Sequence, residues 1–192
     1  MSGRGERSPR YDPGVGLEPP RWGWHRLCDD VAARVVAAAG IAPGDLVVDV
    51  GAGDGALTRP LLKAGARVVA VELHPGRCET LRDRFADERV TVVETDARRY
   101  RWPNQPFRVV ANPPYDLWAA LLRSLLGRNS RLVSADLVLQ RRVVRRIVSA
   151  GAASAHRRGR GYVFERGVAV PRSAFRPHPR VDSAVLRIRR RS

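Results

Sequence analysis

The stretch LVVDVGAGDGALTRPLLKAG, residues 46–65, indicates the fold most directly. It begins with a short apolar run, which is typical of a buried parallel strand, and it ends in a helical segment. Between the two lie Gly51, Gly53 and Gly55, and glycines at such a turn let a ligand approach the backbone closely. A tight turn without a ligand would show the same glycines. The stretch therefore predicts an α/β sheet with a candidate ligand site at the end of its first strand.

Strand and helix patterns alternate on both sides of this turn. Apolar runs predict strands at residues 46–51, 66–73, 89–96, 107–112 and 132–140. Helical periodicity occurs at residues 28–39, 56–65, 75–85 and 116–126. Two later runs, 162–171 and 181–190, are joined by a proline-rich segment and predict an antiparallel edge. We therefore expect a mostly parallel, seven-stranded α/β sheet with helices on both faces and an antiparallel edge strand.

Length and composition favour one cytoplasmic domain. No apolar run reaches the roughly 18 residues of a membrane span, and the N-terminus lacks the apolar region of a secretory signal. Residues 1–20 are rich in Gly, Pro and charge and predict a flexible tail, whereas residues 21–192 are expected to form a single domain without a separate C-terminal RNA-binding domain. Cys28 and Cys78 have neither metal-ligand nor disulfide spacing. We expect a reduced setting, no metal and a monomer.

The net charge of +16 is unevenly distributed along the chain. Residues 1–136 carry 20 basic and 17 acidic side chains, whereas residues 137–192 carry 15 basic and 2 acidic ones. Codon bias toward arginine can explain why Lys63 is the only lysine, but it does not explain the missing acids. A one-sided excess of this kind is expected of a face that binds phosphate groups.

The glycine turn alone leaves the ligand open, because it also satisfies the GxGxx(G/A) pattern of dinucleotide-binding proteins. An acidic residue ends or follows each of the first three expected strands, namely Asp49, Glu72 and Asp96. Glu72 lies where a carboxylate can accept hydrogen bonds from both ribose hydroxyls of a nucleoside. Each acid could also simply cap a helix, but the set of three is similar to that of the class I S-adenosylmethionine-dependent methyltransferases, which have a Rossmann-like fold.

The sequence Asn112-Pro113-Pro114-Tyr115 follows the fourth expected strand directly. It resembles the (D/N)PP(Y/F) motif of methyltransferases that modify an amino group conjugated to a planar ring. Such an amine is a poor nucleophile, and the Asn112 amide oxygen and the Pro113 carbonyl could accept its two N–H groups. The prolines would hold both acceptors rigidly, and Tyr115 would stack on the base. The alternative without a catalytic role is a proline-rigidified turn in which Asn112 caps the following helix.

The C-terminal segment VPRSAFRPHPRVDSAVLRIRR, residues 170–190, closely resembles the signature of the rRNA adenine N6-dimethyltransferases, which include the KsgA/Dim1 enzymes and the erythromycin-resistance (Erm) enzymes. The resemblance covers roughly residues 22–190. It implies that Phe175 packs on the target adenine opposite Tyr115. It also implies S-adenosyl-L-methionine as cofactor, bound by His25, Leu27, Gly51, Gly53, Gly55, Glu72, Leu73, Asp96, Ala97 and Asn112. The family's usual Gln-Asn-Phe-Leu element is replaced here by Trp24-His25-Arg26-Leu27, so its side-chain roles do not carry over, although backbone contacts from His25 and Leu27 could survive. The WGWH segment could equally be a hydrophobic lid on the core.

The segments WGWHRL, VVAVELHP and FRVVANPPY look very similar to those of the short actinobacterial Erm methyltransferases, which lack the helical C-terminal domain. This resemblance implies N6-methylation of one adenine in domain V of 23S rRNA, either protein-free or in an assembly intermediate. It also implies resistance to macrolide, lincosamide and streptogramin B antibiotics. Arginines would have to grip the RNA instead of the missing domain. Candidates are a helical stripe (Arg141, Arg142, Arg145 and Arg146) and a basic loop (Arg157, Arg158 and Arg160), although such runs are usually just solvated.

Three other functions stay open at this point. A DNA adenine or cytosine methyltransferase would need a target-recognition insert, and no segment here is long enough to be one. A catalytically idle rRNA-binding or ribosome-assembly factor could keep the fold, the glycine turn and Asn112. An NAD-dependent oxidoreductase would explain the glycine turn but would leave the sequence Asn112-Pro113-Pro114-Tyr115 unexplained.

Overall fold

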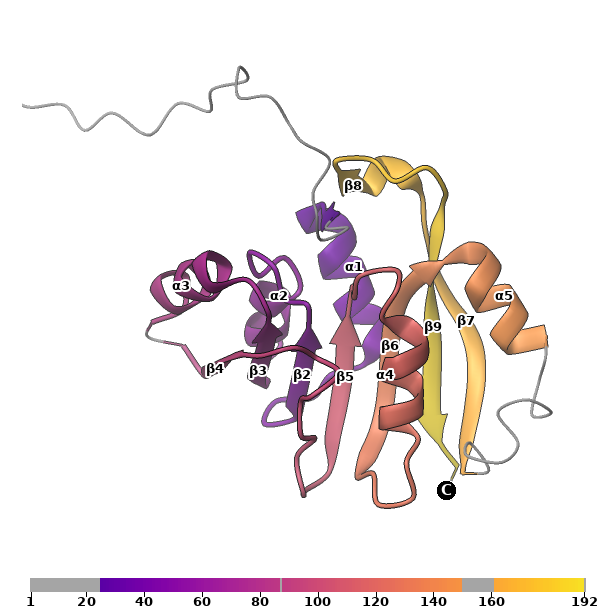
Figure 1. Ribbon diagram of the computed structural model, residues 1–192, viewed down its shortest axis with the longest axis horizontal. Coiled ribbons are helices and arrows are strands. Elements are labelled where there is room, and N and C mark those ends of the chain that lie inside the picture. The colour runs from indigo at the N-terminus through magenta and orange to yellow at the C-terminus, as the bar shows by residue number, and fades with distance from the viewer. Residues whose placement is uncertain (1–24, 87, 150–160, 192) are drawn as a thin grey trace, which may run out of the picture.

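The computed structural model describes residues 25–86, 88–149 and 161–191 (Figure 1). The strands are β1 Arg26–Leu27, β2 Leu46–Val50, β3 Arg67–Glu72, β4 Val90–Glu94, β5 Phe107–Ala111, β6 Leu132–Gln140, β7 Tyr162–Val170, β8 Phe175–Arg176 and β9 Ser183–Arg190. The α-helices are α1 Asp29–Ala39, α2 Thr58–Lys63, α3 Pro75–Arg84, α4 Trp118–Leu125 and α5 Arg141–Ser149. The expected alternation of strands and helices is therefore confirmed. Residues 1–20 of the expected tail lie outside the described residues.

Seven strands form one sheet in the order β4-β3-β2-β5-β6-β9-β7. The strands β4, β3, β2, β5 and β6 are parallel to one another. Strand β9 runs antiparallel to both of its neighbours, β6 and β7. The predicted antiparallel edge is confirmed, and the reversed strand is the one just inside the edge strand β7. The expected mostly parallel, seven-stranded sheet is therefore present.

Alternating side chains along the strands build a core on each face of the sheet. Val47 on β2 packs with α1 and α2, whereas its neighbour Val48 packs on the other face with Leu121 of α4 and Val144 of α5. Helix α3 lies on the α1 side, where its Leu81 packs near the outer strands. The helices thus cover both faces of a buried sheet, as the apolar strand sequences predicted.

Helix α2 is shorter than the segment 56–65 that the sequence predicted, because the glycine turn continues to Leu57. Gly51, Gly53 and Gly55 all have positive φ angles, of 71°, 60° and 87°, and residues in this conformation cannot belong to a right-handed helix. The turn that carries the candidate ligand site is therefore longer than the sequence pattern indicated.

A second, two-stranded sheet was not predicted from the sequence. Strand β1 pairs with β8 in antiparallel fashion, with Arg26 opposite Arg176 and Leu27 opposite Phe175. The pair lies beyond the carboxyl ends of the central strands, next to the N-terminal end of α1 (Figure 1). It brings the segment before the first helix against the segment that follows β7.

Candidate active site

The glycine turn packs directly against the proline turn. The strands β2 and β5 are parallel neighbours, so their carboxyl ends lie side by side. A Cβ atom built on Gly51 would lie 3.2 Å from Cδ of Pro114 and 3.7 Å from Cα of Pro113. The first of these distances is tighter than ordinary van der Waals packing, so a side chain at Gly51 would push the two turns apart. The two motifs singled out in the sequence therefore form one site.

Glu72 is held by backbone amides at the end of β3. Its Oε2 accepts a hydrogen bond from the Gly53 amide at 2.8 Å, and its Oε1 accepts from the amides of Leu73 and His74 at 2.9 Å each. A carboxylate offers about four lone-pair positions, so these three donors leave one, on Oε2. The sequence predicted that Glu72 accepts both ribose hydroxyls, and this geometry leaves room for one.

Leu73, Asp96 and Ala97 lie near Glu72 at the same edge of the sheet. Strands β3 and β4 are parallel neighbours, and the Thr95 amide donates to the Glu72 carbonyl at 2.9 Å. Leu73 is 43% exposed, which is unusual for a leucine and leaves its side chain accessible to a ligand. Asp96 accepts a hydrogen bond from the Arg98 amide at 2.8 Å. The structure thus brings the predicted nucleoside contacts to one edge.

Asp49 presents an unpaired carboxylate oxygen. The side chain is 1% exposed, and its Oδ2 accepts a hydrogen bond from the Thr58 hydroxyl at 2.8 Å. Its Oδ1 is buried without a partner among the described residues. Burial, together with the nearby charge of Glu72, raises the pKa of Asp49 to about 7. A buried acceptor without a donor costs stability, and it suits a ligand that brings N–H groups, such as the amino group of an amino-acid moiety.

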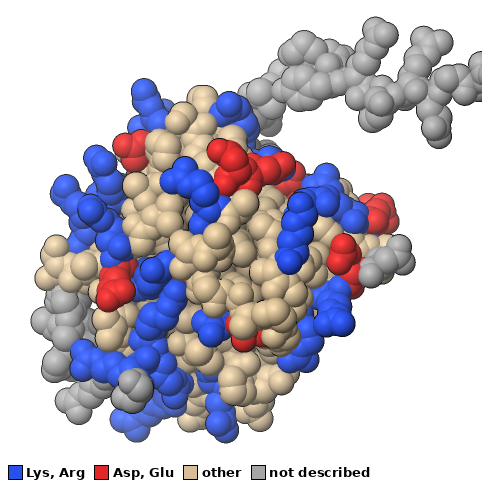
Figure 2. Space-filling model, turned by 180° about the vertical axis from the view of Figure 1, so that it is seen from behind, with Lys and Arg blue, Asp and Glu red and all other residues tan. Residues whose placement is uncertain are grey.

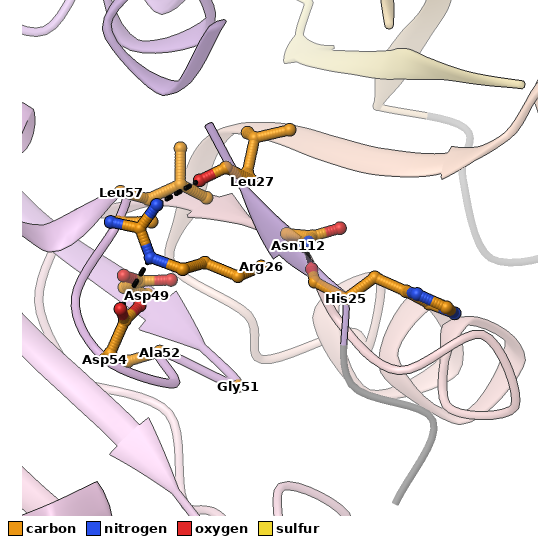
Figure 3. Close-up of a pocket in the computed structure, with 10 residues that line it drawn as sticks. His25, Arg26, Leu27, Asp49, Gly51, Ala52, Asp54, Leu57 and Asn112 are labelled. Carbon is orange, nitrogen blue, oxygen red and sulfur yellow. Dashed lines mark hydrogen bonds and ion pairs between the residues drawn. The ribbon is translucent and has the colours of Figure 1, made fainter. Parts of the chain in front are cut away.

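Asn112 is oriented by a residue that is distant in the sequence. Its Nδ2 donates a hydrogen bond of 2.9 Å to the backbone carbonyl of His25. Because a carbonyl can only accept, this contact fixes which end of the amide is nitrogen and directs Oδ1 to the other side. In Figure 3 the amide oxygen projects away from the glycine turn. Asn112 therefore presents the acceptor that the proposed amine-binding role requires.

The tyrosine of the same motif is held by a hydrogen bond to the start of β9. The Tyr115 hydroxyl forms a hydrogen bond of 3.1 Å with the Ser183 hydroxyl at the start of β9. Burial raises the pKa of the Tyr115 phenol, so the hydroxyl stays protonated. Pro113 is buried, and the Pro114 carbonyl accepts from the Leu117 amide at 3.0 Å, which leads the chain into α4. The rigid turn expected from the two prolines is present.

Phe175 is a core residue in this structure. Its ring is completely buried in the cluster that includes Leu27, Val170 and Val185. The imidazole of His25 lies close to it, with a distance of 6.5 Å between ring centroids. A buried ring cannot contact a base, so the base-packing role predicted for Phe175 stays a prediction that requires the ring to become exposed.

A pocket joins the glycine turn, the proline turn and β1 (Figure 3). It is lined by His25, Arg26, Leu27, Asp49, Gly51, Ala52, Asp54, Ala56, Leu57 and Asn112. His25 and Leu27 were expected at the cofactor, and both line the pocket. No sequence pattern pointed to Arg26 and Asp54, which form an ion pair of 2.6 Å. This pair ties β1 to the glycine turn and closes one side of the pocket.

The arginines predicted to bind RNA are exposed where the structure describes them. Arg141, Arg142, Arg145 and Arg146 all lie on α5 with exposed side chains. Arg157, Arg158 and Arg160 lie outside the described residues. Figure 2 views the face covered by α1, and there too basic side chains gather on the side of β7 and β9. Exposed basic side chains thus occur on α5 and, on the α1 face, on the side of β7 and β9.

Comparison with known proteins identifies the class and then the family. The structure of the 23S rRNA methyltransferase ErmE superposes with a TM-score of 0.76 at 29% identity, over 85% of this chain and 68% of that one. A dimethyladenosine transferase from Plasmodium falciparum shares the fold, with a TM-score of 0.75 at 24% identity over 87% of this chain and 64% of that one. The fold and site are those of an S-adenosylmethionine-dependent methyltransferase. The ribosomal RNA adenine dimethylase family matches residues 27–192, and the chain belongs to this family.

Curated relatives agree with the family. A ribosomal RNA small subunit methyltransferase A from Thermosynechococcus vestitus is 39% identical over 88% of this chain and 68% of its own length. The protein of the same name from Bordetella pertussis is 38% identical over 88% of this chain and 66% of its own length. The chain thus spans about two thirds of these relatives. The cofactor predicted from the sequence, S-adenosyl-L-methionine, is confirmed by the family, and so is the class of rRNA adenine methyltransferase.

The comparisons support the predicted rRNA substrate but not the choice of 23S rRNA. The curated relatives are named for the small ribosomal subunit, whereas the resemblance of short segments predicted 23S rRNA. Within the described ranges, no helix combines the length and hydropathy needed to cross a membrane.

Proposed function

We propose that this protein methylates the N6 amine of one adenine in 23S rRNA and thereby confers resistance to macrolide, lincosamide and streptogramin B antibiotics. The observation that carries the catalytic part is the orientation of Asn112, whose Nδ2 is bonded to the His25 carbonyl while its Oδ1 is left to accept. The likeness to ErmE at 29% identity and the short segments shared with the small Erm enzymes support the choice of 23S rRNA.

Asp49, which lines the pocket, and Glu72, which is bonded to the neighbouring glycine turn, fit the cofactor. Asp49 offers a buried acceptor for its amino group, and Glu72 offers one lone pair to its ribose. S-adenosylmethionine, when bound, supplies an electrophilic methyl group. The protein's own part is to hold the base: Asn112 Oδ1 and the Pro113 carbonyl accept the two N–H groups of the adenine amine, which favours donation of its lone pair. Because the turn is rigid, most of the rate enhancement comes from positioning.

Substitution of Asn112 by alanine tests this role. We expect Asn112→Ala to lower the rate of methyl transfer to 23S rRNA by a factor of about 100 to 1000, as for the loss of one oriented polar group in other sites. Transfer of labelled methyl groups, with mass mapping of the modified nucleotide, measures the rate and the site. An unchanged rate with intact folding would contradict the proposal.

A second candidate target is an adenine of small-subunit rRNA. The 39% identity to a small subunit methyltransferase supports it. The two targets are separated by offering both rRNAs, protein-free and as subunit precursors, to the same enzyme preparation. Methylation confined to small-subunit rRNA would replace the 23S proposal. Methylation of duplex DNA alone, or rRNA binding without transfer, would point to the DNA methyltransferase or to the idle binding factor.

Resistance is tested in a macrolide-sensitive bacterium. We expect expression of the wild-type chain to raise the inhibitory concentration of a macrolide, whereas the Asn112→Ala chain at equal abundance leaves it unchanged. Equal sensitivity of both strains would refute the resistance function, although it would leave the methyltransferase activity intact.

A further inference from the structure

His25 contacts two different parts of the site. Its backbone carbonyl accepts from Asn112 and faces the pocket at the glycine turn. Its imidazole points away from that pocket (Figure 3). On this other side, Nδ1 lies 2.8 Å from the Pro177 carbonyl, and because a carbonyl can only accept, Nδ1 carries the proton of this hydrogen bond. The side chain is thus held on the side opposite the cofactor residues.

The imidazole lies beside two aromatic rings. Its centroid is 5.8 Å from that of Tyr115, with an angle of 34° between the ring planes. It is 6.5 Å from the centroid of Phe175, and those planes are at 74°, an edge-to-face contact. Tyr115 is tied to Ser183, and Phe175 is completely buried. The ring that faces Tyr115 from an accessible position is therefore that of His25, with Phe175 behind it.

We propose that His25 is a base-stacking residue: the target adenine is held between the rings of Tyr115 and His25, and Phe175 supports the imidazole from the core. This inference rests on the proposed function, because it requires an adenine amine at Asn112. A planar base needs about 3.5 Å to each wall, or roughly 7 Å between the two rings. The present centroid distance of 5.8 Å is shorter than this, so the inference requires the imidazole to move away from Tyr115 by roughly 1 Å when the base enters.

The arrangement explains why a ring at position 25 serves the reaction. The backbone carbonyl of His25 orients the Asn112 amide. Residue 25 therefore positions both the ring that stacks on the base and the amide oxygen that accepts its amine. Phe175 has no exposed surface to offer a base in this structure, because it packs in the core with Leu27 and Val185 and beside the His25 ring. Using His25 as the wall leaves that core intact.

Three substitutions separate stacking from the hydrogen bond to Pro177. His25→Phe keeps a ring but loses the donor, His25→Asn keeps a donor but loses the ring, and His25→Ala loses both. All three keep the backbone carbonyl that orients Asn112. We expect His25→Phe to stay within about twofold of wild type in kcat/KM for RNA. Since base stacking on one aromatic ring contributes on the order of tenfold to a hundredfold, His25→Asn and His25→Ala should lose that much.

Two further measurements exclude indirect effects. Cofactor affinity by calorimetry should change by less than about twofold in all three variants, because position 25 lines the pocket through its backbone. An RNA fragment that carries the target adenine should bind wild type and His25→Phe with similar affinity and His25→Asn more weakly. The matched control is His178→Asn at an exposed histidine of the same segment, which is expected to behave as wild type.

The opposite ranking would overturn the inference. If His25→Asn is active and His25→Phe is not, the imidazole serves to hold the Pro177 segment and does not stack. A loss of cofactor affinity in all three variants would assign the side chain to the cofactor and would also overturn it. Absence of methyl transfer by the wild-type protein would refute the proposed function and this inference together. Methyl transfer by the wild-type protein with the opposite ranking of the variants would refute this inference alone.

Discussion

At the scale of single residues, the site combines a carboxylate that is largely hydrogen-bonded within the protein with one that keeps an unpaired oxygen. Glu72 already accepts from three backbone amides, whereas Asp49 has a buried Oδ1 without a partner in the described part of the chain. The motif residues themselves were predictable, because Asn112 and Glu72 follow expected strands. Their partners were not: the His25 carbonyl is 87 positions away from Asn112, and no local pattern encodes such a contact.

Asp49 should make the stability of the ligand-free protein pH-dependent. Its pKa is about 7 in the folded protein and near the ordinary aspartate value when unfolded, so between these values the folded state binds more protons. Stability should therefore fall as the pH rises from about 4 to about 7, by at most about 4 kcal/mol from this group. Asp49→Asn should remove this part of the slope in urea denaturation.

The control for this experiment is Asp30→Asn, which changes an exposed acid of α1 and should keep the wild-type slope. Equal slopes for wild type and Asp49→Asn would show that the carboxyl is ionised throughout. Because a cationic amino group favours ionised Asp49, the cofactor should bind more tightly as the pH rises through about 7.

At the scale of elements, the strand assignments follow directly from apolar runs, and their ends lie within a few residues of the structure. The exceptions have physical causes. Strands β1 and β8 have two residues each, too few for any periodicity, and they form only because tertiary folding brings them together. Helix α2 begins late because Gly55 has a φ of 87°. Local sequence encodes elements of five residues or more, and it does not encode pairing between distant segments.

An ionic cluster links three elements. Asp136 of β6 is 1% exposed and pairs with Arg187 at 3.0 Å and Arg189 at 2.7 Å, both on β9. The two guanidinium groups also donate to the carbonyls of Ala38 and Ala39 at the end of α1, which has no basic residue in its last turn. The cluster thereby satisfies two of the free carbonyls of that helix end.

Removing the central carboxylate should be costly. We expect Asp136→Ala to lower the free energy of unfolding by about 3 kcal/mol, at the lower end for a broken buried ion pair because both arginines also reach solvent. The control Glu94→Ala breaks the exposed Arg82–Glu94 pair of 3.7 Å and should cost less than about 1 kcal/mol. Denaturant unfolding of both variants measures the difference, and similar costs would contradict a structural role of the cluster.

At the scale of the whole molecule, charge and catalysis are arranged around one sheet. The basic side formed by α5, β7 and β9 adjoins the edge where Asn112 and the glycine turn meet, since β9 carries Ser183, the partner of Tyr115. The excess of arginine in the last third of the chain predicted this surface, but not which arginines are paired. Arg141, for example, has an ion pair of 3.9 Å with Asp182.

Two arginines of α5 provide the test of the basic side. We expect Arg145→Gln with Arg146→Gln to weaken RNA binding and to reduce the slope of log K against log salt by roughly 0.7 to 0.9 for each phosphate that the protein no longer neutralises. The control is the double variant Arg82→Gln with Arg89→Gln. It removes the same charge from two exposed residues on the α3 and β4 side. Equal effects of the two double variants would mean that net charge, and not this surface, governs binding.

The pairing of β1 with β8 has a consequence for a chain that is still being synthesised. Asn112, the glycine turn and His25 are all made before residue 116, yet the segment around His25 is held in place only when residues 175 and 176 have been added. Likewise, among the described residues, β7 pairs with no strand other than β9, which lies between it and β6. The site around His25 is therefore completed only after translation has passed β9.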